Sequence, residues 1–497
     1  MNHLHVRAAA LAALTFTACK TVPPPDDTIN PRPQPATRTA TAAAADEAWR
    51  ATQPGAGPAI TAAPPVLREA KLANGLTLLV YESAALPIVT LQLVARGGSG
   101  EDPAKKPGVA QLAAQMLAEG AGGRDGFAFA DAVADLGAFW GSRVDQDKAT
   151  IGLSGAARHA DAMFGLLADV ALRPRFDAKD FAKVQRIQRA NLERAKGSPE
   201  GLAFERIPGI VYGAAHPYGH PVSGTIEAVE RVTLADVRAH HTRVFVPAGA
   251  ALVVVGDVKF DAVRALAEKH LGAWKGTSKV PASYAAVAAR PRKELLFVDM
   301  PGAPQTFIVA ARPMFGRGHP DASAFDVTTE VFGGGGLGTR LNDNLREAKG
   351  YTYGAGASVS ARRGVGALVV STKVRADVTA ESVREIFLEL ERMAIQPPSE
   401  EEVSRAKAGL ILGLPGEFER IGSIAEVGAT IFTYGLPLDH LARELAGLGA
   451  VTEDTAAAAA KQYLDPSVMQ IVLIGDASAH AKAVEALGLG PVRVVKP

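Results

Sequence analysis

The sequence predicts an α+β protein of two duplicated domains, each a mainly antiparallel sheet with helices packed on one face. The first observation is an internal repeat: a Thr N-cap, a proline and a Gly-Asp pair recur with identical spacing, 219 positions apart. These residues are Thr233, Pro247 and Gly256-Asp257 in the first copy and Thr452, Pro466 and Gly475-Asp476 in the second. The second observation is that hairpin signals and helical patterns are segregated rather than alternating, which favours α+β over a doubly wound fold.

The elements of the first copy follow from local rules. Asn74-Gly75 is a strong hairpin-turn signal between two alternating segments. The spacing of apolar residues, every second position in strands and every three to four in helices, then predicts further strands and helices along the chain. The predicted strands are Arg68–Ala73, Leu76–Tyr81, Ile88–Ala95 and segments near Phe139 and Thr150, and the predicted helices are Gly108–Leu117, Phe127–Leu136 and Ala157–Leu172.

Matching helix starts extend the repeat and set the domain limits. Asp177 and Ser399 each open a charged amphipathic helix as an N-cap. Gly, Thr, Ser, Pro and Ala interrupt the periodicity over Lys275–Arg292. We therefore expect one domain over residues 66–276, a linker over 277–292 and a second domain over 293–497.

The N-terminus predicts export. Arg7 and the apolar run that follows it have the charge and length of a secretory signal, over residues 1–19. The chain's only cysteine, Cys19, follows Leu-Thr-Phe-Thr-Ala, which resembles a bacterial lipobox; the alternative is ordinary cleavage near Ala18 with an incidental thiol. Residues 20–65 are rich in Pro, Thr and Ala and are expected to form a disordered tether. Lys20 after the cysteine is typical of lipoproteins on the periplasmic face of the outer membrane of bacteria.

The composition of the chain limits the classes of structure and function that it can have. The chain has 497 residues, 47% of them apolar, which is enough for more than one core. Lys and Arg total 53 against 52 Asp and Glu, so no net charge favours nucleic acid, and no nucleic-acid partner is expected. A single cysteine excludes an internal disulfide.

These features resemble the insulinase-like, or pitrilysin (M16), family of zinc peptidases, in particular its short two-domain branch of processing-peptidase-like proteins. The resemblance covers about Val66 to Ala477. It depends on an ordered set of short marks and not on any one of them. The marks are Asn74–Val80, Gly108-Val-Ala and Met116-Leu117, His216-Pro-Tyr-Gly219, Val255-Gly256-Asp257, Gly333–Leu341 and Leu345-Arg346-Glu347.

The resemblance implies that the zinc site is lost. The family carries His-x-x-Glu-His on a helix, with two histidine ligands on one face and a glutamate that activates water. Here the ligand positions match Gln111 and Gln115, and the base position matches Ala114. The third ligand, a glutamate, falls at Asn191. Neutral amides are poor zinc ligands and alanine cannot accept a proton, so this chain is expected to bind no metal. The glutamines either bind something or form a plain polar helix face.

The resemblance also implies that the other half of the site is kept. The family's second domain supplies an arginine that holds substrate backbone oxygens and a tyrosine that stabilises the oxyanion. They match Arg346 and Tyr353, with Gly350 as a helix stop between them. Tyr351, predicted on the same strand face, is a weaker candidate. Without the family resemblance, the alternative interpretation of such a pair is a surface arginine and a half-buried tyrosine on a strand.

Three functions follow. The leading one is a non-catalytic, substrate-binding subunit that supplies Arg346 and Tyr353 to the zinc site of a homologous partner with an intact His-x-x-Glu-His, which would act on a peptide substrate. The second is a membrane-tethered peptide-binding or assembly scaffold with no role in hydrolysis. The third is an autonomous peptidase with ligands recruited elsewhere. No cofactor is expected in this chain, and zinc is expected in the partner.

Overall fold

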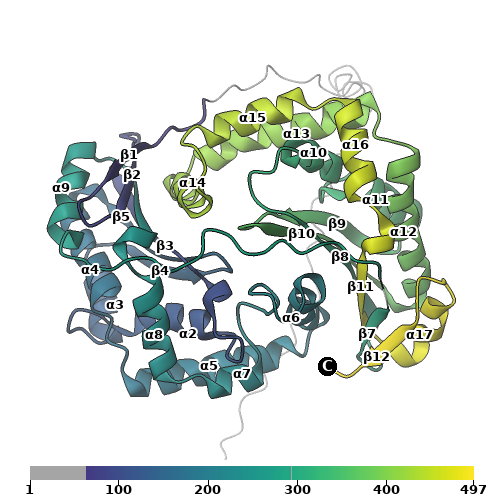
Figure 1. The fold of residues 1–497 in the computed structure, drawn as a ribbon, viewed down its shortest axis with the longest axis horizontal. Helices are drawn as coiled ribbons and strands as arrows, with labels where there is room; N and C mark the ends of the chain where they lie inside the picture. The colour runs from purple at the N-terminus through teal and green to yellow at the C-terminus, as the bar shows by residue number, and fades with distance from the viewer. Residues whose placement is uncertain (1–62, 293) are drawn as a thin grey trace, which may run out of the picture. The chain divides into compact units, whose positions relative to one another are not determined.

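The computed structural model describes residues 63–292 and 294–497, all within a single compact unit. The predicted signal peptide, Cys19 and nearly all of the predicted tether lie outside the described residues. Within the unit two sheets are present, each with its own helices (Figure 1). The domain limits proposed from the sequence stay predictions.

The first sheet has six strands in the order β1-β2-β6-β3-β5-β4. They are β1 (Arg68–Lys71), β2 (Thr77–Glu82), β3 (Ile88–Arg96), β4 (Phe139–Val144), β5 (Lys148–Ala156) and β6 (Ala250–Gly256). All neighbours are antiparallel except β2 and β6. The Asn74-Gly75 turn joins β1 to β2 as predicted, and Gly75 has a φ of 92°, which glycine adopts without strain.

The second sheet repeats this plan in the order β12-β7-β11-β8-β10-β9. Its strands are β7 (Leu295–Asp299), β8 (Gln305–Phe315), β9 (Thr352–Ser360), β10 (Val365–Arg375), β11 (Gln470–Gly475) and β12 (Val492–Val495). The two matched strands that end in Gly-Asp, β6 and β11, occupy the same place in the two sheets. The duplicated α+β architecture is therefore confirmed. Both β4 and β9 are edge strands.

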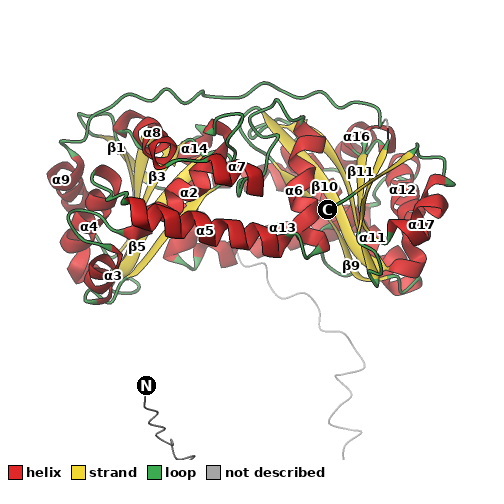
Figure 2. Cartoon of the chain, turned by 90° about the horizontal axis from the view of Figure 1, so that it is seen from below, coloured by secondary structure: helices red, strands yellow, loops and turns green. Residues whose placement is uncertain are grey.

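Helices pack around both sheets (Figure 2). In the first half they are α2 (Val109–Met116), α3 (Gly126–Ala134), α4 (Ala160–Leu172), α5 (Ala178–Ala195), α6 (Pro199–Tyr212), α7 (Ile226–Arg231), α8 (Leu234–Val244) and α9 (Phe260–Leu271). In the second half they are α10 (Ala322–Gly333), α11 (Arg340–Asn342), α12 (Thr379–Ile395), α13 (Glu400–Phe418), α14 (Ile421–Tyr434), α15 (His440–Ala450), α16 (Glu453–Tyr463) and α17 (Ala477–Glu485). The predicted N-caps Asp177, Thr233, Ser399 and Thr452 all accept a backbone N–H at a helix start.

One helix of each half packs on the sheet of the other half. Helix α14 contacts β3 and β6, where its Ile424 and Ala429 join Val253 in an apolar cluster. Helix α6 contacts β8 and β11, where its Leu202 joins Val309. Each sheet therefore has helices of its own half on one face and an exchanged helix on part of the other.

A buried ionic cluster joins the two halves. The Asp147 carboxylate, in the turn between β4 and β5, has no exposed surface. It accepts hydrogen bonds from Arg363 Nε at 3.0 Å, from Tyr434 Oη at 3.0 Å and from Tyr218 Oη. The Arg363 guanidinium also donates to Tyr284 Oη, in the segment predicted as the linker, at 3.1 Å. Helix exchange and this cluster make the halves structurally dependent on each other.

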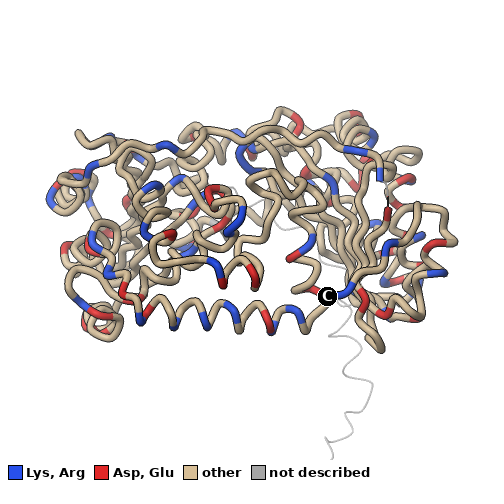
Figure 3. Tube along the Cα trace, turned by 60° about the horizontal axis from the view of Figure 1, so that its bottom comes forward, with Lys and Arg blue, Asp and Glu red and all other residues tan. Residues whose placement is uncertain are grey.

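Charged side chains of both signs are interspersed along the described chain (Figure 3). This distribution agrees with the near balance of acidic and basic residues. None of the helices in residues 63–292 and 294–497 is both long and apolar enough to span a membrane.

Candidate functional site

Helix α2 carries Gln111, Ala114 and Gln115, the positions that the sequence matches to the family's zinc motif. An aspartate outside the helix fixes its start. Asp102 Oδ2 accepts from Gly108 N at 2.7 Å and Oδ1 accepts from Ala110 N at 2.8 Å. Gly108 has a φ of 102°, and a Cβ there would lie 3.1 Å from Gly224 Cα, so glycine is needed. Burial raises the pKa of Asp102 to about 7. The helix survives intact although its chemistry has changed.

The two glutamines of α2 have different surroundings. Gln115 Nε2 donates to Gln188 Oε1 on α5 at 3.0 Å, and Gln188 Nε2 donates on to the Ser223 carbonyl at 2.9 Å. Gln115 Oε1 is buried without a hydrogen-bond partner in the described chain. Gln111 is half-buried. Gln115 therefore has a structural role that the sequence did not reveal, because its hydrogen bond to Gln188 connects α2 to α5.

Ala114 and Asn191 complete the four predicted positions. Ala114 is buried, and its carbonyl accepts from Ser142 Oγ on the edge strand β4 at 2.8 Å. Asn191 is exposed on α5, and its Oδ1 accepts from Arg194 at 3.1 Å. The α5 side chain that hydrogen-bonds to Gln115 of α2 is Gln188, about one turn before Asn191.

This set of side chains does not fit a zinc ion. The groups at or beside the four positions are the carboxamides of Gln111, Gln115, Asn191 and Gln188 and the methyl group of Ala114. Zinc in proteins takes imidazole, thiolate or carboxylate, and none of these is present. The Gln115–Gln188 hydrogen bond also uses an amide N–H, which can only donate. We derive no step through zinc in this chain.

Arg346 and Tyr353 are presented by a short, well-defined turn in the second half. Arg346 lies in the π-helical turn η6 (Asp343–Ala348), and its side chain is 43% exposed, 3.3 Å from Glu347. Gly350 has a φ of 61° and ends the turn, and its N–H donates to the Arg346 carbonyl at 3.0 Å. Tyr353 follows on β9 and is 93% exposed. The predicted placement at a helix end and on the next strand is confirmed.

Tyr351 differs from the expectation. It precedes β9 and packs, partly buried, against the core of the second half, whereas Tyr353 is exposed. A register shift in the β9–β10 ladder between Thr372 and Val374 breaks the simple period of two on which the prediction depended. Tyr351 and Tyr353 therefore do not share a strand face.

Asn342 holds the segment that carries the pair. Its side chain, 2% exposed, donates to the carbonyls of Gly336 and Ala355 at 2.9 and 3.0 Å and accepts from Ala355 N at 2.8 Å. It thus joins the glycine-rich turn before α11 to β9. Among residues 63–292 and 294–497, no hydrogen bond or ion pair connects Arg346 or Tyr353 to Gln111 or Gln115.

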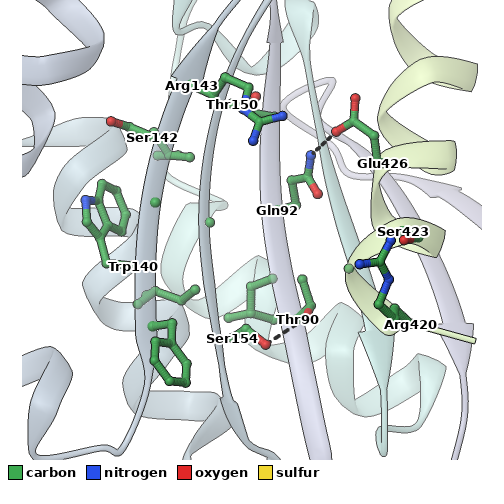
Figure 4. A pocket seen from close by; sticks show the side chains of 17 residues that line it. Thr90, Gln92, Trp140, Ser142, Arg143, Thr150, Ser154, Arg420, Ser423 and Glu426 are labelled. Atoms are coloured by element: carbon green, nitrogen blue, oxygen red, sulfur yellow. Dashed lines mark hydrogen bonds between the residues drawn. The ribbon is translucent and has the colours of Figure 1, made fainter. Parts of the chain in front are cut away.

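A groove of about 620 Å³ lies beside β4, the strand whose Ser142 hydrogen-bonds to the Ala114 carbonyl of α2 (Figure 4). Its floor is the uncovered face of β3, β5 and β4, where Thr90 Oγ1 and Ser154 Oγ lie 3.0 Å apart, and its other wall is the start of α14. Two exposed arginines line it, Arg143 on β4 and Arg420 at the start of α14. No sequence pattern pointed to this groove, because α14 enters it from the other half of the chain.

Comparison with known proteins identifies the family. Residues 78–225 match the profile described as "Insulinase (Peptidase family M16)", and residues 231–410 match the profile described as "Peptidase M16 inactive domain". Together the two matches cover well over half of the chain. The chain belongs to the M16 peptidase family.

Curated relatives include both peptidases and a non-peptidase. The chain is 27% identical over 297 residues to an uncharacterized zinc protease of Mycobacterium tuberculosis, covering 56% of this chain and 64% of that protein. It is 22% identical over 364 residues to the non-peptidase homolog YmxG of Helicobacter pylori, covering 72% of this chain and 82% of that protein. The chain thus matches less than two thirds of the length of its mycobacterial relatives.

Solved structures agree on the fold. A peptidase M16 inactive domain from Pseudomonas fluorescens superposes with a TM-score of 0.77 at 27% identity, over 82% of this chain and 98% of that one. A protease from Helicobacter pylori superposes with a TM-score of 0.76 at 18% identity, over 83% of this chain and all of that one, and shows the fold alone. With the residues of α2, the inactive-type match and the non-peptidase relative indicate a non-catalytic M16 family member.

Proposed function

We propose that this chain is a substrate-binding, non-catalytic subunit that supplies Arg346 and Tyr353 to the zinc site of a homologous M16 partner. The supporting observation is the contrast between the two halves of the site. Every zinc position has lost its chemistry, yet Tyr353 is 93% exposed on a strand that Asn342 fixes in place. The exposed Tyr353 hydroxyl is accessible to a group on another molecule, to which it can donate a hydrogen bond.

The chemistry assigned to the pair needs no metal in this chain. The Arg346 guanidinium is a permanent cation with directed donors that suit the carbonyl oxygens of an extended peptide. The Tyr353 hydroxyl can donate to an oxygen that becomes negative in the transition state. The partner would supply zinc and the proton acceptor, and a peptide would be the substrate.

The test uses the complex with a homologue that carries His-x-x-Glu-His. Removing one oxyanion donor costs about a hundredfold or more in kcat, so Tyr353→Phe should lower peptide hydrolysis by that order, and Arg346→Ala should also lower it. Zinc content should not change. Tyr351→Phe, which alters a partly buried neighbour, is the matched control and should leave the rate unchanged. Full activity in Tyr353→Phe and Arg346→Ala would refute the proposal.

A second candidate is a peptide-binding or assembly scaffold without any role in hydrolysis. The groove beside β4 favours it, because an edge strand offers unpaired backbone groups and the groove adds Arg143 and Arg420. Co-purification distinguishes the candidates. Only the first requires a zinc-bearing homologue among the proteins captured from native membranes.

We also propose that Cys19 carries a lipid that anchors the chain in the bacterial cell envelope, at the periplasmic face of the outer membrane. The support is the Leu-Thr-Phe-Thr-Ala-Cys19 sequence with Lys20 after it. Cys19→Ser should move the protein from the membrane fraction to the soluble fraction, because acyl chains supply the membrane affinity. Unchanged membrane retention of the variant would contradict the anchor.

A further inference from the structure

A buried network ties the turn that carries Arg346 to helix α12. Asn344, two residues before Arg346 in η6, donates from Nδ2 to Glu385 Oε2 at 3.1 Å and to Glu389 Oε1 at 2.6 Å. Both glutamates belong to α12 and are 5% and 4% exposed. One amide nitrogen thus gives both of its N–H groups to two buried carboxylates.

The other end of the turn is tied to the same helix. The ammonium of Lys349, the residue that follows η6, lies 3.5 Å from Glu385 Oε1. Arg346 is therefore bracketed by Asn344 and Lys349, and Glu385 contacts both of them. Two further cations approach the carboxylates; they are Arg384, 3.6 Å from Glu385, and Arg392, which donates to Glu389.

The backbone bonds of this turn are few. They run from Lys349 N to Asn344 O at 3.1 Å, from Gly350 N to Arg346 O at 3.0 Å and from Tyr351 N to Leu345 O at 2.8 Å. A single helical turn is marginal by its backbone bonds alone, and a π-helical turn is a rare form. The side-chain anchors on α12 therefore decide how firmly this turn is held.

Position 344 needs a hydrogen-bond donor. Asn344 Oδ1 is buried without a hydrogen-bond partner in the described chain, so the two N–H groups account for the place of this side chain. Aspartate has nearly the same shape, but when ionised it can only accept, and at position 344 it would face two carboxylates. The exchange of one atom group at this position thus turns an anchor into a repulsion.

We propose that Asn344 is a positioning residue, which sets the place of Arg346 relative to a bound peptide by holding η6 on α12. The inference rests on the proposed function, which gives Arg346 the carbonyl oxygens of the peptide. Tyr353 is held separately, because Asn342 fixes its strand. Loss of the Asn344 anchor should therefore disturb the Arg346 contact and leave the Tyr353 hydroxyl in place.

The first test measures hydrogen exchange of the turn in the purified chain by mass spectrometry. In Asn344→Asp the amides of Lys349, Gly350 and Tyr351 should exchange about tenfold faster or more, because two hydrogen bonds to charged groups are lost. Asp343→Asn, the reverse exchange at the exposed neighbouring residue, is the control and should leave these rates unchanged.

Thermal melting checks that the variants are folded. If Asn344→Asp does not fold, Lys349→Met is the second variant, because it removes only a partly exposed cation from Glu385. It should also increase exchange of the turn, by a smaller factor. Unchanged exchange in the folded variants would overturn the inference.

The second test uses the complex with the zinc-bearing homologue and separates KM from kcat. Loss of an interaction made equally with the substrate and the transition state raises KM alone, so Asn344→Asp should raise KM by about tenfold and leave kcat within about twofold. In the Arg346→Ala background the same substitution should change KM by no more than about twofold, because residues that act through one contact are not additive. A merely structural defect would add to the loss in that background.

The outcomes separate this inference from the proposed function. Unchanged hydrolysis in Arg346→Ala would refute the proposed function. If Arg346→Ala raises KM and Asn344→Asp does not, or if the two effects add, only the positioning role of Asn344 is overturned.

Discussion

Substitution of Asp147 tests whether the two halves depend on the ionic cluster between them. Asp147→Ala removes the acceptor for Arg363, Tyr218 and Tyr434 and leaves the Arg363 guanidinium, 4% exposed, without its carboxylate. Loss of one partner of a buried ion pair costs about 3–5 kcal/mol. We expect the free energy of unfolding to fall by that amount.

The assay is urea unfolding followed by circular dichroism, in which the midpoint should fall while the slope with urea stays constant. Asp257→Ala removes an exposed carboxylate and should change stability by no more than about 0.5 kcal/mol. In Asp147→Ala/Arg363→Met the unpaired charge is gone, so about 2 kcal/mol or more should be recovered. A double variant no more stable than Asp147→Ala would refute the reasoning.

Two further predictions concern packing and pH. A Cβ on Gly428 of α14 would lie 2.7 Å from Val253 Cγ1, so Gly428→Ala should lower the free energy of unfolding by about 1–3 kcal/mol. A Cβ on Gly422 of the same helix would meet nothing within 4 Å, so Gly422→Ala should raise the free energy of unfolding by about 0.5 kcal/mol. Equal effects of the two variants in urea unfolding would contradict the contact between Gly428 and Val253. Burial, and then Arg243 and His241, lower the pKa of His240 to about 3, so the unfolded chain binds more protons below about pH 6.5 and stability should decrease as the pH falls toward 3. Each pH unit in this window accounts for at most about 1.4 kcal/mol from this group, and His240→Gln should flatten the urea midpoint against pH; an unchanged profile would count against it.

Local features of the fold were predictable and long-range ones were not. The Asn74-Gly75 turn and the Thr233 and Thr452 caps depend on residues within a few positions, and all were confirmed. The exchange of α6 and α14 was not predictable, because an amphipathic helix pattern does not say which sheet it covers. The Asp147 cluster gathers side chains from five distant segments, so no spacing revealed it.

The candidate site shows the same division. The positions Gln111, Ala114 and Gln115 were found from motif spacing, and the turn that presents Arg346 and Tyr353 followed from one glycine. The contact of Gln115 with Gln188 instead of Asn191 depends on how α2 and α5 pack. The β9 register shift that separates Tyr351 from Tyr353 has no signature in the sequence.

The most direct measurement is the zinc content and peptidase activity of the purified chain alone, after dialysis against zinc and with contaminating proteases removed. Neutral carboxamides and an alanine stand where metal ligands and a general base are needed. We therefore predict no tightly held zinc and no chelator-sensitive cleavage of peptides. About one tightly bound zinc per chain, with cleavage that a chelator abolishes, would contradict the account.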